Sequence, residues 1–202
     1  MSETERRIGI FGGTFDPPHE GHLMAARESA AACGLERVLF VPAGEPWQKE
    51  RYSSPEDRFM MTVLATSDDP VMAVSRIELD RPGATYTVGT LEQLRDFYGA
   101  TTAFFFILGA DAALNLGSWV GLERLAELTD VIAVLRPGSD LGLLEPGEGW
   151  PEVHVLKVDG IEMSSTTIRD RIRAGGPPGP LVPSPVVEYI EARGLFLEAA
   201  RP

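Results

Sequence analysis

Several residue types are scarce in this sequence of 202 residues, and each scarcity excludes a class of protein. The single cysteine, Cys33, cannot form an internal disulfide, and its Ala-rich surroundings predict a packing role rather than a reactive thiol. The longest apolar run, Ala103 to Ala110, is far too short to cross a membrane, and the first residues lack the apolar core of a signal peptide. We therefore expect a protein of the reducing cytoplasm with no membrane partner.

Positive charge is scarce as well. The chain has two lysines, Lys49 and Lys157, and its formal net charge is −12. Surfaces that bind nucleic acid are usually basic, so this charge argues against a nucleic-acid partner. A local pocket can still be positive in an acidic protein, and arginine, which supplies most of the basic residues, binds phosphate through two parallel hydrogen bonds. The composition thus leaves room for a small anionic ligand.

Stretches typical of strands and of helices alternate along the chain. This alternation predicts one α/β domain over residues 1–202, a Rossmann-like, doubly wound parallel sheet with helices on both faces. The expected strands are 8–11, 38–41, 71–74, 103–108, 131–135 and 153–158. The expected helices are 21–32, one that begins at Ser54, 87–98, and the two closing helices 164–173 and 184–193. In such a sheet the loops that follow the strands share one edge, where ligands bind at the point of strand-order reversal.

The first expected strand ends in a glycine-rich turn that carries two histidines. The turn runs Gly-Gly-Thr-Phe-Asp-Pro-Pro-His-Glu-Gly-His from Gly12 to His22 and enters a helix. Glycines let the backbone approach a ligand, and a helix N-terminus presents N–H groups and partial positive charge to phosphate. His19 and His22 could both face this loop, or they could only cap the helix. Neither lysine follows a glycine, which excludes a P-loop, and the glycines do not fit Gly-x-Gly-x-x-Gly.

A second polar group opens the expected helix 164–173. Ser164, Ser165 and Thr166 stand at its start, and Arg169 follows one turn later. Hydroxyl groups, free N–H groups and a guanidinium together suit a polyphosphate. An ordinary Ser/Thr helix cap with a solvated arginine explains the same pattern. The sequence alone leaves both interpretations open.

A third group follows the most apolar strand. Gly109 and Asp111 come directly after it, and Trp119 lies a little further on. Asp111 is expected at the ligand edge, where its carboxylate could accept hydrogen bonds from a ribose or hold hydrated Mg²⁺. Trp119 could stack on a flat ring or simply belong to the core.

Together these motifs resemble the signature of bacterial nicotinate mononucleotide adenylyltransferases, within the nucleotidyltransferase superfamily marked by HxGH and SSTxxR. Here the motifs are His19-Glu20-Gly21-His22 and Ser164-Ser165-Thr166 to Arg169, and the resemblance extends from Ile8 to about Phe196. It implies transfer of AMP from ATP to nicotinate mononucleotide, giving nicotinate adenine dinucleotide and pyrophosphate in NAD biosynthesis. It also implies Mg²⁺ carried by the phosphates of ATP, without dedicated protein ligands.

The resemblance further implies a role for each motif residue. Catalysis would fall to His19, His22, Lys49 and Arg169. ATP would be bound by Gly12, Gly13, Thr14, Phe15, His22, Gly109, Asp111, Arg136, Ser164, Ser165, Thr166 and Arg169. The acceptor would be bound by Asp16, Lys49, Thr85, Tyr86 and Trp119.

One stretch departs from the family pattern. Many members carry a basic and an aromatic residue just before Leu181, where this chain has only glycine and proline from Gly175 to Pro180. Any contact of that loop with ATP or in a homo-oligomer must then come from its backbone or from elsewhere. Three alternatives stay open: another acceptor such as nicotinamide mononucleotide or phosphopantetheine, a nucleotide sensor without turnover, and a relative that handles nucleic acid.

Overall fold

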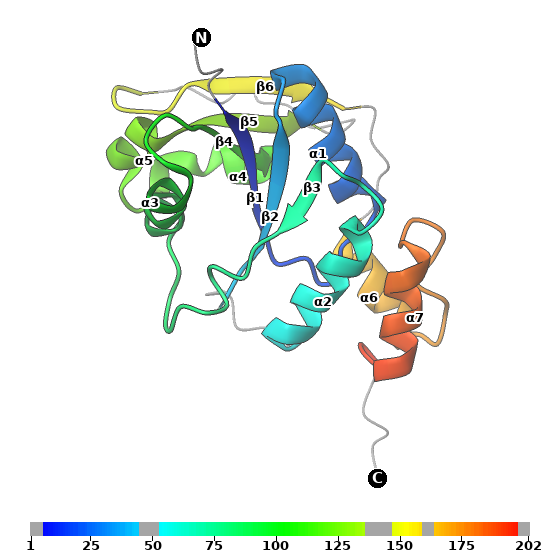
Figure 1. Ribbon diagram of the computed structural model, residues 1–202. Coiled ribbons are helices and arrows are strands. Elements are labelled where there is room, and N and C mark those ends of the chain that lie inside the picture. The colour runs from blue at the N-terminus through cyan, green and yellow to red at the C-terminus, as the bar shows by residue number, and fades with distance from the viewer. Residues whose placement is uncertain (1–5, 45–52, 136–146, 159–163, 198–202) are drawn as a thin grey trace.

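A computed structural model of the chain describes residues 6–44, 53–135, 147–158 and 164–197. Within them, the strands form one parallel sheet of six in the order β3-β2-β1-β4-β5-β6 (Figure 1). The strands are β1 Arg7–Gly13, β2 Arg37–Pro42, β3 Met72–Val74, β4 Ala103–Gly109, β5 Thr129–Leu135 and β6 Val153–Lys157. The sheet confirms the predicted doubly wound α/β class.

Helices cover both faces of this sheet. They are α1 Glu20–Cys33, α2 Pro55–Thr66, α3 Thr87–Tyr98, α4 Ala110–Leu114, α5 Leu122–Leu128, α6 Ser165–Arg173 and α7 Ser184–Arg193, with a 3₁₀ turn at Leu116–Ser118. Side chains alternate along a strand, so β1 contributes Ile8 and Ile10 to one core and Phe11 to the other. The first core packs under α3, α4 and α5, and the second packs under α1.

A third apolar cluster lies beyond the carboxyl end of the sheet. It joins α2 to the two closing helices through the buried side chains of Met61, Ile168, Ile172, Val182, Val186 and Ile190. Figure 1 shows α2, α6 and α7 side by side at this end of the molecule. The closing helices therefore belong to the edge where the loops after β1 and β2 emerge.

Most expected elements agree with the structure to within two residues at each end. Helices 87–98 and 184–193 agree at both ends. The sequence interpretation missed α4 and α5, which have five and seven residues. Helices this short show too few turns for an apolar period to stand out.

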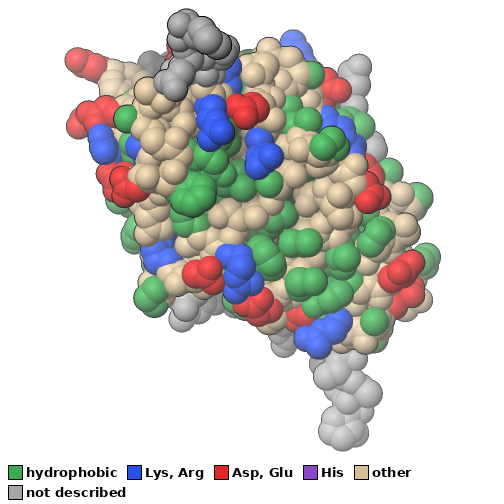
Figure 2. Space-filling view, viewed as in Figure 1, with side chains coloured by type: hydrophobic (Ala, Val, Ile, Leu, Met, Phe, Trp, Pro, Cys, Tyr) green, Lys and Arg blue, Asp and Glu red, His purple; other side chains and the backbone are tan. Residues whose placement is uncertain are grey.

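Charged side chains of both signs are interspersed on the face drawn in Figure 2, where blue Lys and Arg groups stand beside red Asp and Glu groups. Ion pairs of this kind include Arg27 with Asp69 at 2.8 Å and Arg124 with Glu92 at 3.0 Å. None of the described helices combines the length and the apolar character that a membrane span requires.

Candidate active site

The strand order reverses between β1 and β4. These strands are neighbours, yet β1 leads to β2 on one side while β4 leads to β5 on the other. A crevice forms at the carboxyl ends of strands at such a point. A pocket of about 200 Å³ opens there. Its lining residues are Phe11, Gly12, Gly21, His22, Met24, Ala25, Leu108, Gly109, Val134 and Val158.

Aromatic packing explains the glycines of the first motif. A Cβ on Gly13 would come within 2.9 Å of the Phe15 ring, and a Cβ on Gly12 within 3.0 Å of the Phe106 ring. Phe15 itself has φ 51°, a left-handed conformation that is uncommon for a bulky residue. Its ring is 2% exposed and packs in the core. The side chain of Phe15 therefore fixes the turn, and only its backbone is available to a ligand.

The two histidines of the first motif occupy different environments. His19 precedes α1 and is 1% exposed, whereas His22 lines the pocket. The backbone N–H of His19 donates to Nδ1 of His22 at 3.3 Å, and the ring centroids lie 3.8 Å apart. The two histidines thus cap the start of α1, and His22 also lines the pocket. Because Nδ1 accepts a hydrogen bond, the proton of a neutral His22 ring lies on Nε2.

Helix α6 docks on the loop that joins the two histidines to the glycines. The Ser165 hydroxyl donates to the carbonyl of Pro17 at 2.8 Å, and Nη1 of Arg169 donates to the carbonyl of Asp16 at 2.7 Å. Ser164 caps the helix by accepting from the Thr167 amide at 3.1 Å. The start of α6 therefore has an ordinary serine cap and also contacts the loop after β1. The structure thus places the SSTxxR motif against the HxGH motif.

The remaining hydroxyl of this motif lies at the surface. Thr166 is exposed, and its Oγ1 accepts from Nη2 of Arg169 at 3.1 Å. The guanidinium is therefore oriented by bonds to its own helix and to the loop after β1.

Asp16 is a buried carboxylate at the centre of these contacts. It is 1% exposed, and burial raises its pKa above 3.8. A hydrogen bond of 3.1 Å from the Ser53 amide to Oδ2, and the positive charges of Arg169 and Arg58, act in the opposite direction. Oδ1 is buried without a hydrogen-bond partner among the described residues. The Asp16 side chain thus joins the loop after β1 to the segment that leads into α2.

Three of the residues expected to bind the acceptor lie just before α3 and just after the 3₁₀ turn. The Thr85 hydroxyl donates to Glu78 at 2.8 Å, and Tyr86, which precedes α3, is 54% exposed. Trp119 is half-buried and meets the Phe106 ring edge to face, with centroids 5.7 Å apart. Because Phe106 also lies against Gly12, one aromatic ring separates Trp119 from the glycine turn.

Four further expected site residues divide into two pairs. Gly109 precedes α4 and lines the pocket, and Asp111 is exposed in the first turn of that helix. Lys49 and Arg136 lie outside the described residues.

The residue that follows the Gly/Pro loop contacts the start of α1 through its backbone. The carbonyl of Leu181 accepts from the Glu20 amide at 2.8 Å. Glu20 is the first residue of α1, so one of the N–H groups at that helix start is already bonded within the protein. This contact is made by the backbone and needs no charged or aromatic side chain.

Possible metal ligands occur at both ends of the sheet. Asp130, Glu152 and His154 lie close enough to share an ion, but they stand at the amino ends of β5 and β6, opposite the pocket. Asp111 is exposed two residues after Gly109, which lines the pocket, and its carboxylate is a suitable oxygen ligand. One carboxylate fits a magnesium ion that receives its other oxygen ligands from phosphate and water.

Sequence interpretation missed two polar residues near the site, Arg58 and Glu78. Arg58 is 1% exposed within α2, and Glu78 accepts from the hydroxyls of Thr85 and Thr90, each at 2.8 Å. Arg58 stands three residues before Met61, on the buried face of its helix, and a charged residue on an apolar face was the available signal. No pattern in the sequence distinguishes Glu78.

Comparisons with known proteins address the family of this chain. The model of the cytidylyltransferase-like family matches residues 10–171. A protein of Saccharopolyspora erythraea, named "Probable nicotinate-nucleotide adenylyltransferase", is 48% identical over 195 residues, covering 95% of this chain and 90% of the relative. A protein of Acidothermus cellulolyticus with the same name is 46% identical over 204 residues, covering 97% of each.

A solved structure supports the fold. The Plasmodium falciparum nicotinic acid mononucleotide adenylyltransferase complexed with NaAD superposes with a TM-score of 0.79, at 18% identity, over 95% of this chain and 97% of that one. The family match and the extent of the bacterial similarity confirm the resemblance seen in the motifs. The chain belongs to the cytidylyltransferase-like family and, within it, to the nicotinate-nucleotide adenylyltransferases.

Proposed function

We propose that residues 1–202 act as one nucleotidyltransferase domain that moves the AMP moiety of ATP to nicotinate mononucleotide in the cytoplasm. The products are nicotinate adenine dinucleotide and pyrophosphate, in NAD biosynthesis. The observation that carries the proposal is the docking of Ser165 and Arg169 on the carbonyls of Pro17 and Asp16. This contact joins both motifs of the family beside a pocket lined by His22 at the strand-order reversal.

The chemistry requires no general base. A phosphate monoester has a second pKa of about 6, so the acceptor is mostly a dianion at neutral pH. One of its oxygens attacks the α-phosphorus of ATP and forms the new P–O–P link. The bond from that phosphorus to the β-phosphate oxygen breaks, and pyrophosphate leaves with the electron pair. The protein has to align two anions and stabilise the charge that grows between them.

His22 is the best candidate for a hydrogen-bond donor to that charge. Its Nδ1 accepts from the His19 backbone at 3.3 Å, which leaves the proton of a neutral ring on Nε2. A donor held in this way needs no reorganisation during the reaction. His19, which is buried, would act by holding His22 in position. Arg169, together with Lys49 and Arg136, would supply positive charge.

The remaining assignments concern binding. The backbone of Gly12, Gly13, Thr14 and Phe15 would approach the phosphates, and the hydroxyls at the start of α6 would face them from the other side. Gly109 and Asp111 would lie beside the nucleotide. Thr85, Tyr86 and Trp119 would hold the nicotinate end of the acceptor, with Asp16 and Lys49 nearer its phosphate.

Magnesium fits the proposed site as a companion of ATP. When bound, the ion neutralises phosphate charge and makes pyrophosphate a better leaving group. Asp111 is the carboxylate that would assist in holding it, directly or through water.

The test is pyrophosphate release with ATP and Mg²⁺, with nicotinate mononucleotide, nicotinamide mononucleotide and phosphopantetheine supplied separately. A site built for a carboxylate discriminates strongly against an amide, because its donors would otherwise stay unpaired. We expect the first acceptor to be preferred, with nicotinate adenine dinucleotide as product. Preference for another acceptor would change the assigned substrate, and ATP binding without turnover would indicate a sensor.

A further inference from the structure

Arg58 is a buried cation that does not line the pocket. Its side chain is 1% exposed in the second turn of α2. Burial of a guanidinium is unfavourable unless its N–H groups find acceptors. Three carbonyl groups accept from it, those of Thr14 at 3.2 Å, Gly44 at 3.0 Å and Ser53 at 3.3 Å.

These carbonyls come from three separate segments of the chain. Thr14 lies in the glycine-rich turn after β1, Gly44 follows β2, and Ser53 leads into α2. The Ser53 amide in turn donates to the Asp16 carboxylate at 3.1 Å. Arg58 thus binds the carbonyl of Ser53 while Asp16 binds its N–H group. Gly44 is confined from its other side, since a Cβ there would collide with the carbonyl oxygen of Glu78.

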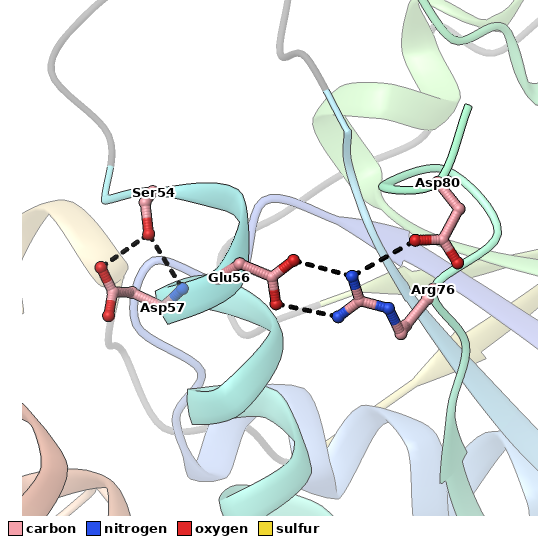
Figure 3. Close-up of polar contacts among 5 residues, drawn as sticks. All are labelled: Ser54, Glu56, Asp57, Arg76 and Asp80. Atoms are coloured by element: carbon pink, nitrogen blue, oxygen red, sulfur yellow. Dashed lines mark hydrogen bonds and ion pairs between the residues drawn. The ribbon is translucent and has the colours of Figure 1, made fainter. Parts of the chain in front are cut away.

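The helix that carries Arg58 is anchored at its first turn, as Figure 3 shows. Ser54 accepts from the Asp57 amide at 3.1 Å and caps the helix. Glu56 forms a two-bonded ion pair with Arg76 at 2.7 and 2.9 Å, and Arg76 reaches Asp80 at 3.2 Å. These contacts hold the first turn of the helix, next to Arg58.

We propose that Arg58 is a positioning residue for the reaction, which sets the backbone of the phosphate-binding turn at Thr14 against the backbone of Gly44 and Ser53. It acts through the backbone of these segments and touches no substrate. The inference rests on the proposed function, because it takes the turn after β1 to be the one that receives ATP.

Only a guanidinium suits this arrangement. Its N–H groups point in fixed, divergent directions within one plane, whereas a lysine ammonium is a single point with three donors. Arg58→Lys keeps the charge but cannot reach three carbonyls that lie around a planar group. Arg58→Met keeps much of the volume and removes every donor. A shift of about 1 Å in a positioned group can reduce a rate by about 100-fold.

The experiment compares both variants with the wild-type chain and with Arg76→Met. Arg76 anchors the same helix from the surface and does not contact the turn, so its loss reports general loosening of α2. Circular dichroism sets a temperature at which each variant is folded. Steady-state pyrophosphate release then gives kcat and the KM for ATP, and calorimetry gives the Kd for ATP.

We expect Arg58→Lys to raise both the KM and the Kd for ATP at least 10-fold and to lower kcat/KM by about 10- to 100-fold. Arg76→Met should leave the KM within about 2-fold. If kcat, KM and Kd are all unchanged in both folded Arg58 variants, Arg58 has a purely structural role and the proposal is overturned. If the wild-type chain turns over no acceptor, the proposed function fails, while the Kd comparison still decides the role of Arg58.

Discussion

Nη1 of Arg169 donates a 2.7 Å hydrogen bond to the backbone carbonyl of Asp16, although 153 positions separate the two residues. The guanidinium is half-buried and also donates to Thr166 on its own helix. Two short motifs at opposite ends of the sequence thereby become one surface. The position of Arg169 depends on the loop after β1, and the position of that loop depends on Arg169.

Arg169→Lys should reveal this dependence in the kinetics. A lysine cannot donate to Asp16 and Thr166 in the same fixed geometry. We expect kcat/KM for ATP to fall by about 100-fold in the pyrophosphate-release assay, with little change in Tm. Arg173→Met is the matched control, because Arg173 lies on the same helix and pairs only with exposed Asp170 among the described residues. Equal kcat/KM for Arg169→Lys and the wild-type chain would show that Arg169 has no role in ATP binding or catalysis.

His22→Ala should retain its fold and lose most of its turnover. Removal of one preorganised donor lowers kcat by about 10²–10³-fold. The control is His154→Ala, at the amino end of β6 and away from the pocket, for which we expect normal turnover. A near-normal kcat for His22→Ala would mean that the main donor lies elsewhere.

Gly44→Ala and Gly109→Ala should differ in stability. A Cβ on Gly44 meets a backbone carbonyl that cannot move aside, whereas a Cβ on Gly109 meets nothing within 4 Å. Overpacking of this kind costs about 1–3 kcal/mol. We expect urea unfolding to show that loss for Gly44→Ala and a free energy of unfolding close to wild type for Gly109→Ala. Similar values for the two would contradict the close contact with Glu78.

Most of the fold could be predicted from the sequence, because buried parallel strands are continuous apolar runs and are easily recognised. Phe104 to Leu108 is such a run and forms the core of β4. Asp130 and His154 make β5 and β6 less apolar at their starts, yet the ends of both strands were still predicted closely. Short helices such as α5 were missed because their burial depends on α3, which packs from another part of the chain.

The site was predicted less completely than the fold. His22 and Arg169 were expected at the site because they are residue types that bind phosphate and stand near the start of a helix. Arg58 has no such signature, since its function follows from three carbonyls that only folding brings together. The backbone of Phe15 was expected to approach ATP, and the sequence did not indicate that its buried ring packs against the turn.

Stability should depend on pH through Asp57, which joins α2 to α7. Burial works to raise its pKa, but hydrogen bonds from Ser54, Tyr189 and Arg193 outweigh burial and lower the pKa below 3.8. A lowered pKa contributes stability above the unfolded value, and that stability is lost as the pH falls through the folded value.

Asp57→Asn should therefore lower the free energy of unfolding by about 1–3 kcal/mol at neutral pH. Thermal melts from pH 7 downward should show the gap between wild type and variant narrowing once the pH drops below 3.8. Asp96→Asn, at an exposed position on α3, should give no such trend. A gap that stays constant down to acid unfolding would contradict the role of the carboxylate.

Trp119→Ala and Trp119→Phe should separate stacking from packing. Stacking of a flat ring on an aromatic side chain contributes about 1–3 kcal/mol, so its loss should raise the KM for nicotinate mononucleotide about 10-fold or more. The KM for ATP should change little, and the phenylalanine variant should recover most of the affinity. If Tm falls in both variants while the acceptor KM stays constant, Trp119 serves only to pack on Phe106.

The bond from the Glu20 amide to the carbonyl of Leu181 has a consequence for synthesis on the ribosome. A nascent chain emerges from its N-terminus, and the strands of this sheet are complete once Lys157 has left the exit tunnel. Three features lack their partners at that stage, because the partners are translated afterwards. They are the start of α1, the Asp16 carbonyl and the apolar face of α2. The edge that carries the candidate site is thus the last region to fold, because its partners on α6, at Leu181 and on α7 leave the ribosome last.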